Sequence, residues 1–488
     1  MSWMRCLCHR CVSIRCNIFR RGVKIDMSSI FFNPKKVAII GATANPRKFG
    51  NVVTENILMN KERNYEIFLV SLKKQPINGL ETYESILDIP GEIDLAIILV
   101  PARAVEEVVD DCIKKTVKGI IIVTGGFGEI NDEGKTLEKR IAIKCKDASI
   151  RVIGPNCVGI QNLDIGLNAS FILQPKKGDI GFITQSGSFG AAVLYAMRDA
   201  NLGCSKFANL GNMIDVSYSE VLEYYNQDPS TKIICMYLES VSKGREFFSC
   251  IKNVIPNKPI LVVKGGRTAT GMRAASSHTG SLSTNYNLLK SAVEQAGGYI
   301  IEYIADYTTA LKALSFNPIP KGDKIGVLTN SGGSSVLFSD QAEQYGLKFA
   351  KFSDELIEKI RPHVIKLVKM VNPLDMIAGA REEQYYQVTK AMLESNDVDI
   401  VVPACVITPF LEIEWDEHYR GMIRAWNETG RKKPMIPLLV FADSFPQIHA
   451  LSEKENSTAF FTPYQAAYAC KVLIDRMNYF KKINEDNK

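Results

Sequence analysis

His278 is the residue whose surroundings most directly suggest chemistry. It stands in "SSHTGS", among hydroxyl groups and glycines, and it is one of only five histidines. No second histidine or cysteine is near enough in sequence to share a metal ion with it, whereas Lys264, Arg267 and Arg273 precede it. An imidazole nitrogen can attack a phosphoryl group and form a phosphohistidine, whose negative charge suits a basic segment. The alternative is a purely structural histidine, the commoner role of a lone histidine.

Two similar turns could hold phosphate. The segments "TQSGSFG" and "TNSGGSS" each place Ser-Gly where a strand passes into a helix, so unpaired backbone N–H groups and the positive end of the helix dipole converge. Neither segment fits the GxSxG pattern of a serine nucleophile, although a plain structural turn remains an alternative for either one alone. The candidate phosphate-binding residues are Ser186, Gly187, Ser188, Ser331, Gly332 and Gly333.

A phosphohistidine also needs an acceptor for its second ring nitrogen, which fixes the attacking tautomer. Glu239 ends the apolar run "KIICMYLES". Because functional sites gather at the carboxyl ends of parallel strands, Glu239 is the acid that we expect to orient His278. The segment from Gly265 to Ser283 is rich in small and polar residues, and we expect it to form a long loop that carries His278.

The first strand-to-helix turn, "IIGATANPRKFGN", could bind a nucleotide-like ligand. Its glycine permits a tight turn before a helix N-terminus, but the segment lacks the GxGxxG pattern of dinucleotide-binding proteins. The next strand is followed by Lys73 and Lys74, where an NAD-binding protein would carry an acid. These lysines suit the extra ribose phosphate of coenzyme A or NADP, unless they are merely two solvated side chains.

The elements that position these residues follow an α/β pattern. Short Val/Ile-rich runs alternate with amphipathic stretches from Asn33 onward, which predicts parallel sheets covered by helices. "IGFITQSGS" and "IGVLTNSGG" open two related units, and the Pro/Gly-rich "SFNPIPKGDK" separates these units. We expect a Rossmann-like domain followed by two flavodoxin-like domains, with the divisions 1–26 (an extension), 27–160, 161–318 and 319–488.

Charge and cysteine content set the N-terminal segment apart. Residues 1–26 carry six basic side chains and one acidic side chain, so the net charge of +6 leaves the rest of the chain nearly neutral and predicts no nucleic-acid-binding face. Four cysteines crowd this segment, in no standard zinc spacing. The segment resembles an organelle transit peptide, or it is upstream sequence before a true start at Met27.

No apolar run is long enough to cross a membrane. We expect a cytoplasmic protein, or one in a mitochondrion-like organelle if residues 1–26 are a transit peptide.

Taken together, these motifs resemble the alpha subunit of the ADP-forming acyl-CoA synthetases, relatives of succinyl-CoA synthetase. The resemblance covers almost everything from about Ile30 to Phe480, and "SSHTGSLS" is its most specific part. The other matching segments are "GATANPRKFGN", "IGPNCVGI", "ITQSGSFG", "GNMIDVSYSEVLEY", "YLES", "TNSGGSSVLFSD" and "NPLDM".

The resemblance implies roles for individual residues. His278 would be the phosphorylated histidine, Glu239 would bind its ring, and both Ser-Gly turns would cradle its phosphate. The residues that match the CoA-binding side are Gly41, Thr43, Lys48, Lys73, Pro101 and Asn156. Lys73 is a looser match, because the family usually has "NP" where this chain has Ser71 and Leu72.

The implied reaction converts acyl-CoA, ADP and phosphate to the acid, ATP and CoA. Phosphate displaces CoA to give an acyl phosphate, His278 takes the phosphoryl group, and its loop swings to deliver the group to ADP. The sequence contains no Walker motif and no recognisable ATP-grasp module. ADP or ATP and Mg²⁺ are therefore expected on an ATP-grasp beta subunit. The rival interpretations are a non-catalytic CoA-binding regulatory subunit of the same fold and, more distantly, an NADP-linked dehydrogenase.

Overall fold

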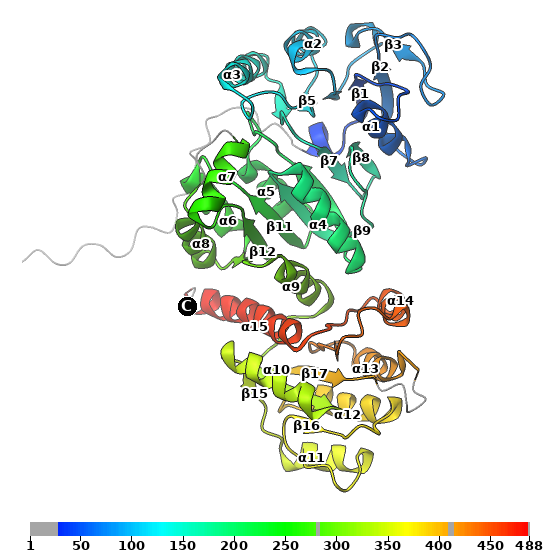
Figure 1. The fold of residues 1–488 in the computed structure, drawn as a ribbon, viewed down its shortest axis with the longest axis vertical. Coiled ribbons are helices and arrows are strands. Elements are labelled where there is room, and N and C mark those ends of the chain that lie inside the picture. The colour runs from blue at the N-terminus through cyan, green and yellow to red at the C-terminus, as the bar shows by residue number, and fades with distance from the viewer. Residues whose placement is uncertain (1–27, 280–283, 408–413, 487–488) are drawn as a thin grey trace, which may run out of the picture.

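The computed structural model describes residues 28–279, 284–407 and 414–486, and it contains three units, each built on a largely parallel sheet. Figure 1 shows the units one above another, with the first unit in blue and cyan, the second in green and the third from yellow to red. The α/β fold class predicted from the sequence is confirmed. The predicted leader at residues 1–26 lies outside the described residues, so its nature stays a prediction.

The first unit has a six-stranded, all-parallel sheet in the order β3-β2-β1-β4-β5-β6. This is the Rossmann order, in which the direction of winding reverses between β1 and β4 and leaves a crevice for a ligand at the strands' carboxyl ends. Its strands are β1 (Lys36–Ile40), β2 (Glu66–Val70), β3 (Thr82–Tyr83), β4 (Leu95–Ile98), β5 (Gly119–Ile122) and β6 (Arg151–Ile153). Its helices are α1 (Phe49–Leu58), α2 (Ala102–Lys114) and α3 (Asp132–Asp147).

The second unit has a seven-stranded sheet in the order β13-β12-β11-β9-β10-β7-β8, with the antiparallel pair β7–β8 at one edge. Its strands are β7 (Gly159–Asn162), β8 (Leu167–Ser170), β9 (Lys177–Thr184), β10 (Cys204–Asn209), β11 (Ile233–Leu238), β12 (Ile260–Lys264) and β13 (Tyr299–Ile300). Its helices are α4 (Gly187–Asp199), α5 (Tyr218–Gln227), α6 (Gly244–Val254), α7 (Ala269–Thr279), α8 (Tyr286–Gln295) and α9 (Ile304–Phe316).

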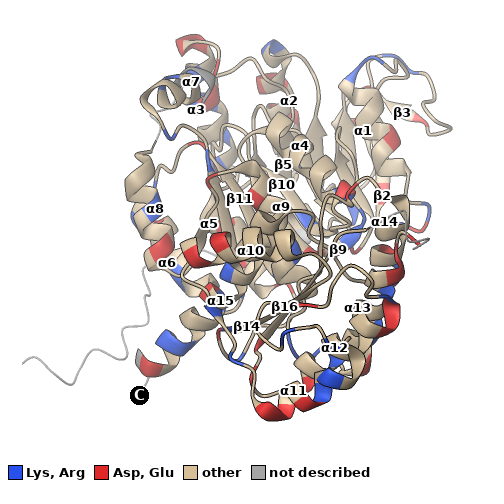
Figure 2. Ribbon diagram, turned by 60° about the horizontal axis from the view of Figure 1, so that its bottom comes forward, with Lys and Arg blue, Asp and Glu red and all other residues tan. Residues whose placement is uncertain are grey.

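The third unit has a smaller parallel sheet in the order β15-β14-β17-β18, with β16 also paired to β14. Its strands are β14 (Lys324–Thr329), β15 (Lys348–Phe349), β16 (Leu374–Asp375), β17 (Ile400–Cys405) and β18 (Leu438–Leu439). Its helices are α10 (Gly332–Gln344), α11 (Asp354–Ile360), α12 (Glu382–Glu394), α13 (Glu417–Glu428), α14 (Pro446–Lys454) and α15 (Pro463–Asp486). Figure 2 shows basic and acidic residues side by side on α12 and α13, where Arg424 pairs with Glu383 at 2.7 Å.

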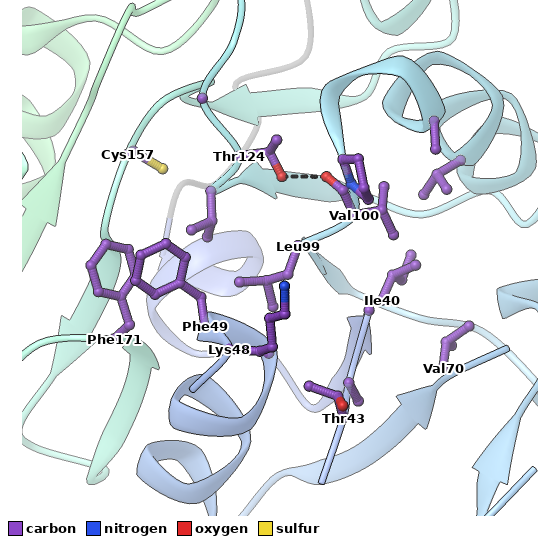
Figure 3. A pocket seen from close by; sticks show the side chains of 18 of the residues that line it. Ile40, Thr43, Lys48, Phe49, Val70, Leu99, Val100, Thr124, Cys157 and Phe171 are labelled. Atoms are coloured by element: carbon purple, nitrogen blue, oxygen red, sulfur yellow. Dashed lines mark hydrogen bonds between the residues drawn. The ribbon is translucent and has the colours of Figure 1, made fainter. Parts of the chain in front are cut away.

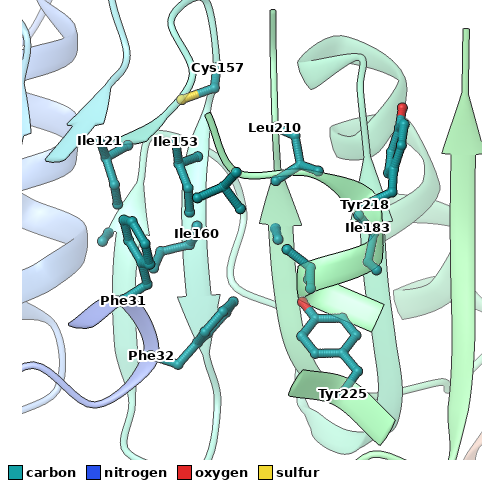
Figure 4. Packing of buried hydrophobic residues seen from close by; sticks show 14 of the residues in the cluster. Phe31, Phe32, Ile121, Ile153, Cys157, Ile160, Ile183, Leu210, Tyr218 and Tyr225 are labelled. Atoms are coloured by element: carbon teal, nitrogen blue, oxygen red, sulfur yellow. The ribbon is translucent and has the colours of Figure 1, made fainter. Parts of the chain in front are cut away.

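A shared core joins the first two units. Phe31 and Phe32, in a short helical turn before β1, are fully buried against residues of both sheets (Figure 4). The Phe32 ring stacks on Tyr224 of α5 with 4.6 Å between centroids. Burying two phenylalanines gives several kcal/mol, about 1.5–3 for each ring, so the contact fixes one sheet against the other. This rigid junction matters because the cavity described below lies across it.

The second and third units are joined by α9 and α15, which lie between the two sheets (Figure 1). Tyr464 of α15 donates to the buried Asp306 carboxylate of α9 at 2.9 Å, and Tyr299 donates to the Val472 carbonyl at 3.0 Å. Apolar residues of both units form one continuous core around these helices. Among the described residues, no helix combines the length and apolar character that crossing a bilayer requires.

The structure corrects one expectation about the His278 segment. Residues expected to form a loop contain the helix α7, which includes His278 in its last turn. The Thr268 hydroxyl accepts from the Gly271 N–H at 3.1 Å and caps the start of this helix. The segment is also rich in alanine, which has the strongest helix propensity. The predicted divisions at 160 and 318 stay predictions; the first of them falls inside β7.

Candidate functional site

A cavity of about 1090 Å³ lies between the first and second units, at the carboxyl ends of β1, β2, β4 and β5. It is lined from both units, because the first Ser-Gly turn of the second unit faces the strand ends of the first. The position agrees with the crevice that the Rossmann strand order creates. A ligand held here would therefore reach from the tip of β2 to the start of α4.

All six residues assigned to the CoA side line this cavity: Gly41, Thr43, Lys48, Lys73, Pro101 and Asn156. In Figure 3 the Lys48 side chain extends from the start of α1 into the space beside Leu99. Of the two lysines after β2, only Lys73 lines the cavity; Lys74 pairs with Glu84 at 3.1 Å. The structure thus brings the predicted residues together, and their contacts with a ligand stay predictions.

Close backbone contacts explain the glycine at the first turn. Gly41 has φ of +99°, and a Cβ there would lie 3.0 Å from the Leu99 carbonyl carbon. A Cβ on Gly50 would lie 2.1 Å from the Gly41 carbonyl oxygen. Side chains at either position would push α1 away from the tip of β1. The glycines therefore hold the N-terminus of α1 close to the cavity.

The first predicted phosphate-binding turn lies at the opposite end of the same cavity, where Ser186, Gly187 and Ser188 all contribute to the lining. The Ser186 hydroxyl accepts from the Phe189 N–H at 3.4 Å and caps α4. The buried Asn209 amide donates to the carbonyls of Thr184 and Gln185 at 3.0 Å, and its oxygen accepts from the Val158 N–H at 2.6 Å. The turn is thus held rigidly, as a preorganised anion site requires.

Gln185 connects this turn to Glu239, and sequence reasoning missed it. Its side-chain oxygen accepts from the N–H groups of Glu239 at 2.9 Å and Ser240 at 3.0 Å. The Tyr218 hydroxyl donates to the same oxygen at 2.9 Å. Gln185 itself lines the cavity, and Glu239 is 6 % exposed. The amide in "TQSG", which recurs in "TNSG", was the signal that could have revealed this role.

Lysine and tyrosine side chains surround Glu239. The Lys264 ammonium donates to the Glu239 carbonyl oxygen at 2.9 Å, and burial lowers the pKa of Lys264 although the Glu239 charge opposes that shift. Burial also raises the pKa of Tyr237, and the neighbouring Glu239 charge adds to that increase. Glu239 thus lies in a low-dielectric region, where its charge acts strongly on neighbouring groups.

His278 belongs to α7, and its side chain lies outside the described residues, as do residues 280–283. The described ends of the segment are both fixed beside Glu239. The Gly265 N–H donates to the Leu238 carbonyl at 2.9 Å, and the Val241 N–H donates to the Thr284 hydroxyl at 2.8 Å. Thr284 follows His278 by six residues, which span at most about 20 Å. The predicted pairing of His278 with Glu239 stays a prediction that this anchoring favours.

The second Ser-Gly turn, Ser331, Gly332 and Gly333, starts α10 in the third unit. None of its residues is among the described residues that line the cavity. The Asn330 amide binds both backbone groups of Val406, at 2.9 and 3.0 Å. Its predicted role at the same phosphate therefore stays a prediction, and the structure brings only the first turn to the cavity.

Comparison with known proteins agrees with this arrangement. A CoA-binding-domain model matches residues 35–162, and a model of the succinyl-CoA ligase-like flavodoxin domain matches residues 177–314. The alpha subunit of ADP-forming acetate–CoA ligase II of Pyrococcus furiosus is 36 % identical, over 92 % of this chain and 98 % of that protein. The chain belongs to the family of ADP-forming acetate–CoA ligase alpha subunits. The resemblance inferred from the sequence is confirmed.

Other family members extend the comparison. The alpha subunit of ligase I from the same organism is 33 % identical, over 91 % of this chain and 96 % of that subunit. A solved structure of the dinucleotide-forming acetyl-coenzyme A synthetase 1 of Ca. Korarchaeum cryptofilum, in complex with phosphate and ADP, has a TM-score of 0.86 and 32 % identity. The match covers 92 % of this chain and 97 % of the solved chain. The two Pyrococcus relatives are named as subunits of ADP-forming acetate–CoA ligases, which are acid–thiol ligases.

Proposed function

We propose that this chain is the alpha subunit of an ADP-forming acyl-CoA synthetase that converts acyl-CoA, ADP and phosphate to the acid, ATP and CoA. The observation that carries the proposal is the single cavity lined at one end by Gly41, Lys48 and Lys73 and at the other by the Ser186–Ser188 turn. Coenzyme A would lie along the first group of residues. Its thioester would then meet phosphate at the second.

The first step takes place within this cavity. A phosphate oxygen attacks the thioester carbonyl carbon, the carbon–sulfur bond breaks, and CoA leaves as the thiolate with an acyl phosphate as the other product. The N–H groups at the start of α4 hold the phosphate and the charge that develops on it. Cys157 also lines the cavity, but burial raises the pKa of its thiol to about 12, so it remains protonated and does not compete as a nucleophile.

The second step moves the phosphoryl group to His278. An imidazole nitrogen of His278 attacks the phosphorus of the acyl phosphate, and the carboxylic acid leaves as its anion. Glu239 accepts a hydrogen bond from the other ring nitrogen and so holds the attacking tautomer. Gln185 positions Glu239 through its bond to the Glu239 N–H at 2.9 Å.

The nucleotide half of the reaction belongs to a partner in this proposal. The ADP-forming acetate–CoA ligase I of Archaeoglobus fulgidus is 33 % identical over 93 % of this chain, which covers only 65 % of that relative. The word subunit in the names of the Pyrococcus relatives also supports a partner. An ATP-grasp beta subunit would bind ADP and Mg²⁺ and receive the phosphoryl group from His278.

Labelling with phosphate tests the proposal. The full chain, incubated with an acyl-CoA and ³²P-phosphate, should gain acid-labile, base-stable label, and His278→Asn should remove it. His363→Asn is the matched control, because His363 lies in the third unit and outside the cavity lining, and it should keep the label. Persistence of the label in His278→Asn would disprove the assignment of the nucleophile. CoA binding without any label would favour the regulatory-subunit alternative, and NADP binding would favour a dehydrogenase.

A further inference from the structure

The end of the cavity next to the Ser186–Ser188 turn is walled by apolar side chains. Phe49, the first residue of α1, and Phe171, which follows β8, stack with 4.3 Å between ring centroids and 27° between ring planes. Val158 and Ile172 line the same region. Figure 3 shows the two rings side by side below Cys157, away from Ile40 and Val70. The two phenylalanines come from different units, so this wall exists only where the units meet.

Contacts with the turn identify this as the reacting end. A Cβ on Gly187 would lie 2.3 Å from Val158 Cγ1, and the Phe171 N–H donates to the Val158 carbonyl at 3.3 Å. The aromatic wall is therefore joined to the phosphate turn through a single residue, Val158. If phosphate attacks the acyl carbon at this turn, the rest of the acyl group lies against Phe171 and Phe49. The basic Lys73 lies at the other end, after β2.

We propose that the stacked Phe49 and Phe171 rings are the acyl-recognition surface, and that this chain prefers apolar acyl groups larger than acetyl. This inference rests on the proposed function. Phe49 is 60 % exposed, which is unusual for a phenylalanine that lines a cavity, so much of its ring is left for a ligand to cover. An acetyl group brings only one methyl to this surface, whereas a longer or aromatic acyl group covers more of it.

The wall is rigid enough to select among acyl groups. Phe49 is fixed by the close contact of Gly50 with the Gly41 carbonyl, and the Asn56 amide of α1 donates to the Ser170 carbonyl, next to Phe171, at 2.8 Å. Each additional methylene buried against such a surface gives about a fourfold gain in binding. Butyryl-CoA, which has two more methylenes, should therefore bind about fifteenfold tighter than acetyl-CoA, and phenylacetyl-CoA at least as tightly as butyryl-CoA.

Equilibrium binding and turnover of a series of acyl-CoA esters test the inference. The full chain would be titrated calorimetrically with CoA, acetyl-CoA, butyryl-CoA, phenylacetyl-CoA and succinyl-CoA, and CoA release would be followed after phosphate is added. Phe171→Ala and Phe49→Ala should each lower the phenylacetyl-to-acetyl affinity ratio about tenfold. Phe441→Ala is the matched control, because Phe441 is 73 % exposed in the third unit and should leave the ratio unchanged.

The two readouts separate the two proposals. Selective binding that depends on Phe49 and Phe171, without CoA release from any ester, would support the recognition surface and disprove the proposed reaction. CoA release at rates independent of the acyl group, or tighter binding of succinyl-CoA than butyryl-CoA, would overturn the recognition surface and leave the reaction standing. Because Phe49 is largely exposed, its alanine variant also tests the idea if Phe171→Ala fails to fold.

Discussion

The two Ser-Gly turns share an architecture but differ in what surrounds them. In both turns a threonine hydroxyl, from Thr184 or Thr329, donates to the serine carbonyl two residues later, at 2.7 and 3.1 Å. In both turns the residue after the threonine, Gln185 or Asn330, has a side-chain amide. Its oxygen accepts from a backbone N–H just beyond the end of the neighbouring strand, β11 or β17. The units thus repeat the strand, the turn, the helix and the amide clamp that holds the turn in place.

The two turns differ at the residue whose backbone N–H the amide side chain binds. Thr184 pairs with Tyr237 on β11, and Thr329 pairs with Ala404 on β17. Two residues beyond those partners the chain has Glu239 in the second unit and Val406 in the third. Only the turn with the acid lines the described cavity. A repeated Ser-Gly turn therefore does not bring the same surroundings with it; the carboxylate and the cavity set the second unit apart.

Replacing the acid is the strongest way to test this difference. Glu239→Gln keeps the size of the side chain but removes the negative charge that would orient an imidazole. We expect phosphohistidine formation to slow by about a hundredfold while CoA affinity stays unchanged. Rapid-quench labelling with ³²P-phosphate would measure the rate, and calorimetry would measure CoA binding.

Val406→Ala provides the comparison in the sister turn. It should leave the labelling rate within about twofold of the wild type, because Val406 has no charge that could act on an imidazole. Equal slowing by Glu239→Gln and Val406→Ala would contradict the difference proposed between the turns. Unchanged labelling in Glu239→Gln would mean that another group orients His278.

The amide clamps give a second test. Gln185→Ala leaves three buried donors without their acceptor, on Glu239, Ser240 and Tyr218, and Asn330→Ala frees the backbone groups of Val406. Unsatisfied buried groups cost about 1–3 kcal/mol each, so both variants should unfold at lower urea concentration. Only Gln185→Ala should also slow labelling, by about tenfold, because it releases Glu239. A labelling defect of the same size in Asn330→Ala would instead show that both turns serve the phosphate.

The sequence could predict the strands and turns, but not the amide contacts that hold the turns in place. The alternating apolar runs predicted three parallel-sheet units, and the residues that begin and end the strands predicted both turns, because strand ends and turn chemistry are local properties. The meeting of the Ser186–Ser188 turn with the six predicted CoA-side residues depended on how the first two units pack, which Phe31 and Phe32 help to determine over a long sequence separation. The α7 helix was missed because Thr268 caps a segment whose serines and glycines are typical of a loop.

Adding one methyl group to each turn gives a third test. Gly187→Ala would bring a Cβ within 2.3 Å of Val158 Cγ1, whereas Gly333→Ala meets nothing within 4 Å. Overpacking should lower the free energy of unfolding by about 2 kcal/mol for Gly187→Ala. Gly333→Ala should raise it by about 0.5 kcal/mol, because glycine weakens a helix. Urea unfolding measures both, and equal destabilisation would contradict the difference in packing between the turns.

The α9–α15 junction joins the second and third units and so places the two turns relative to each other. It contains a buried lysine. Lys312 of α9 donates to the Ala459 carbonyl and lies 5.0 Å from the ring centroids of Phe460 and Phe461. Burial lowers the pKa of Lys312 to about 8 from its ordinary value of 10.5. Between these values the unfolded chain binds a proton at this lysine that the folded chain does not. The free energy of unfolding therefore rises with pH across this window.

Lys312→Met should remove this pH dependence, because methionine keeps the apolar contacts and carries no proton. The difference in unfolding free energy between wild type and variant should change by at most about 1.4 kcal/mol per pH unit between pH 8 and 10. Urea unfolding at closely spaced pH values would measure it. A constant difference across this range would mean that Lys312 stays charged in the fold, held by the Ala459 carbonyl and the two aromatic rings. The junction would then contain an ammonium ion among apolar side chains, and both units would be needed to stabilise it.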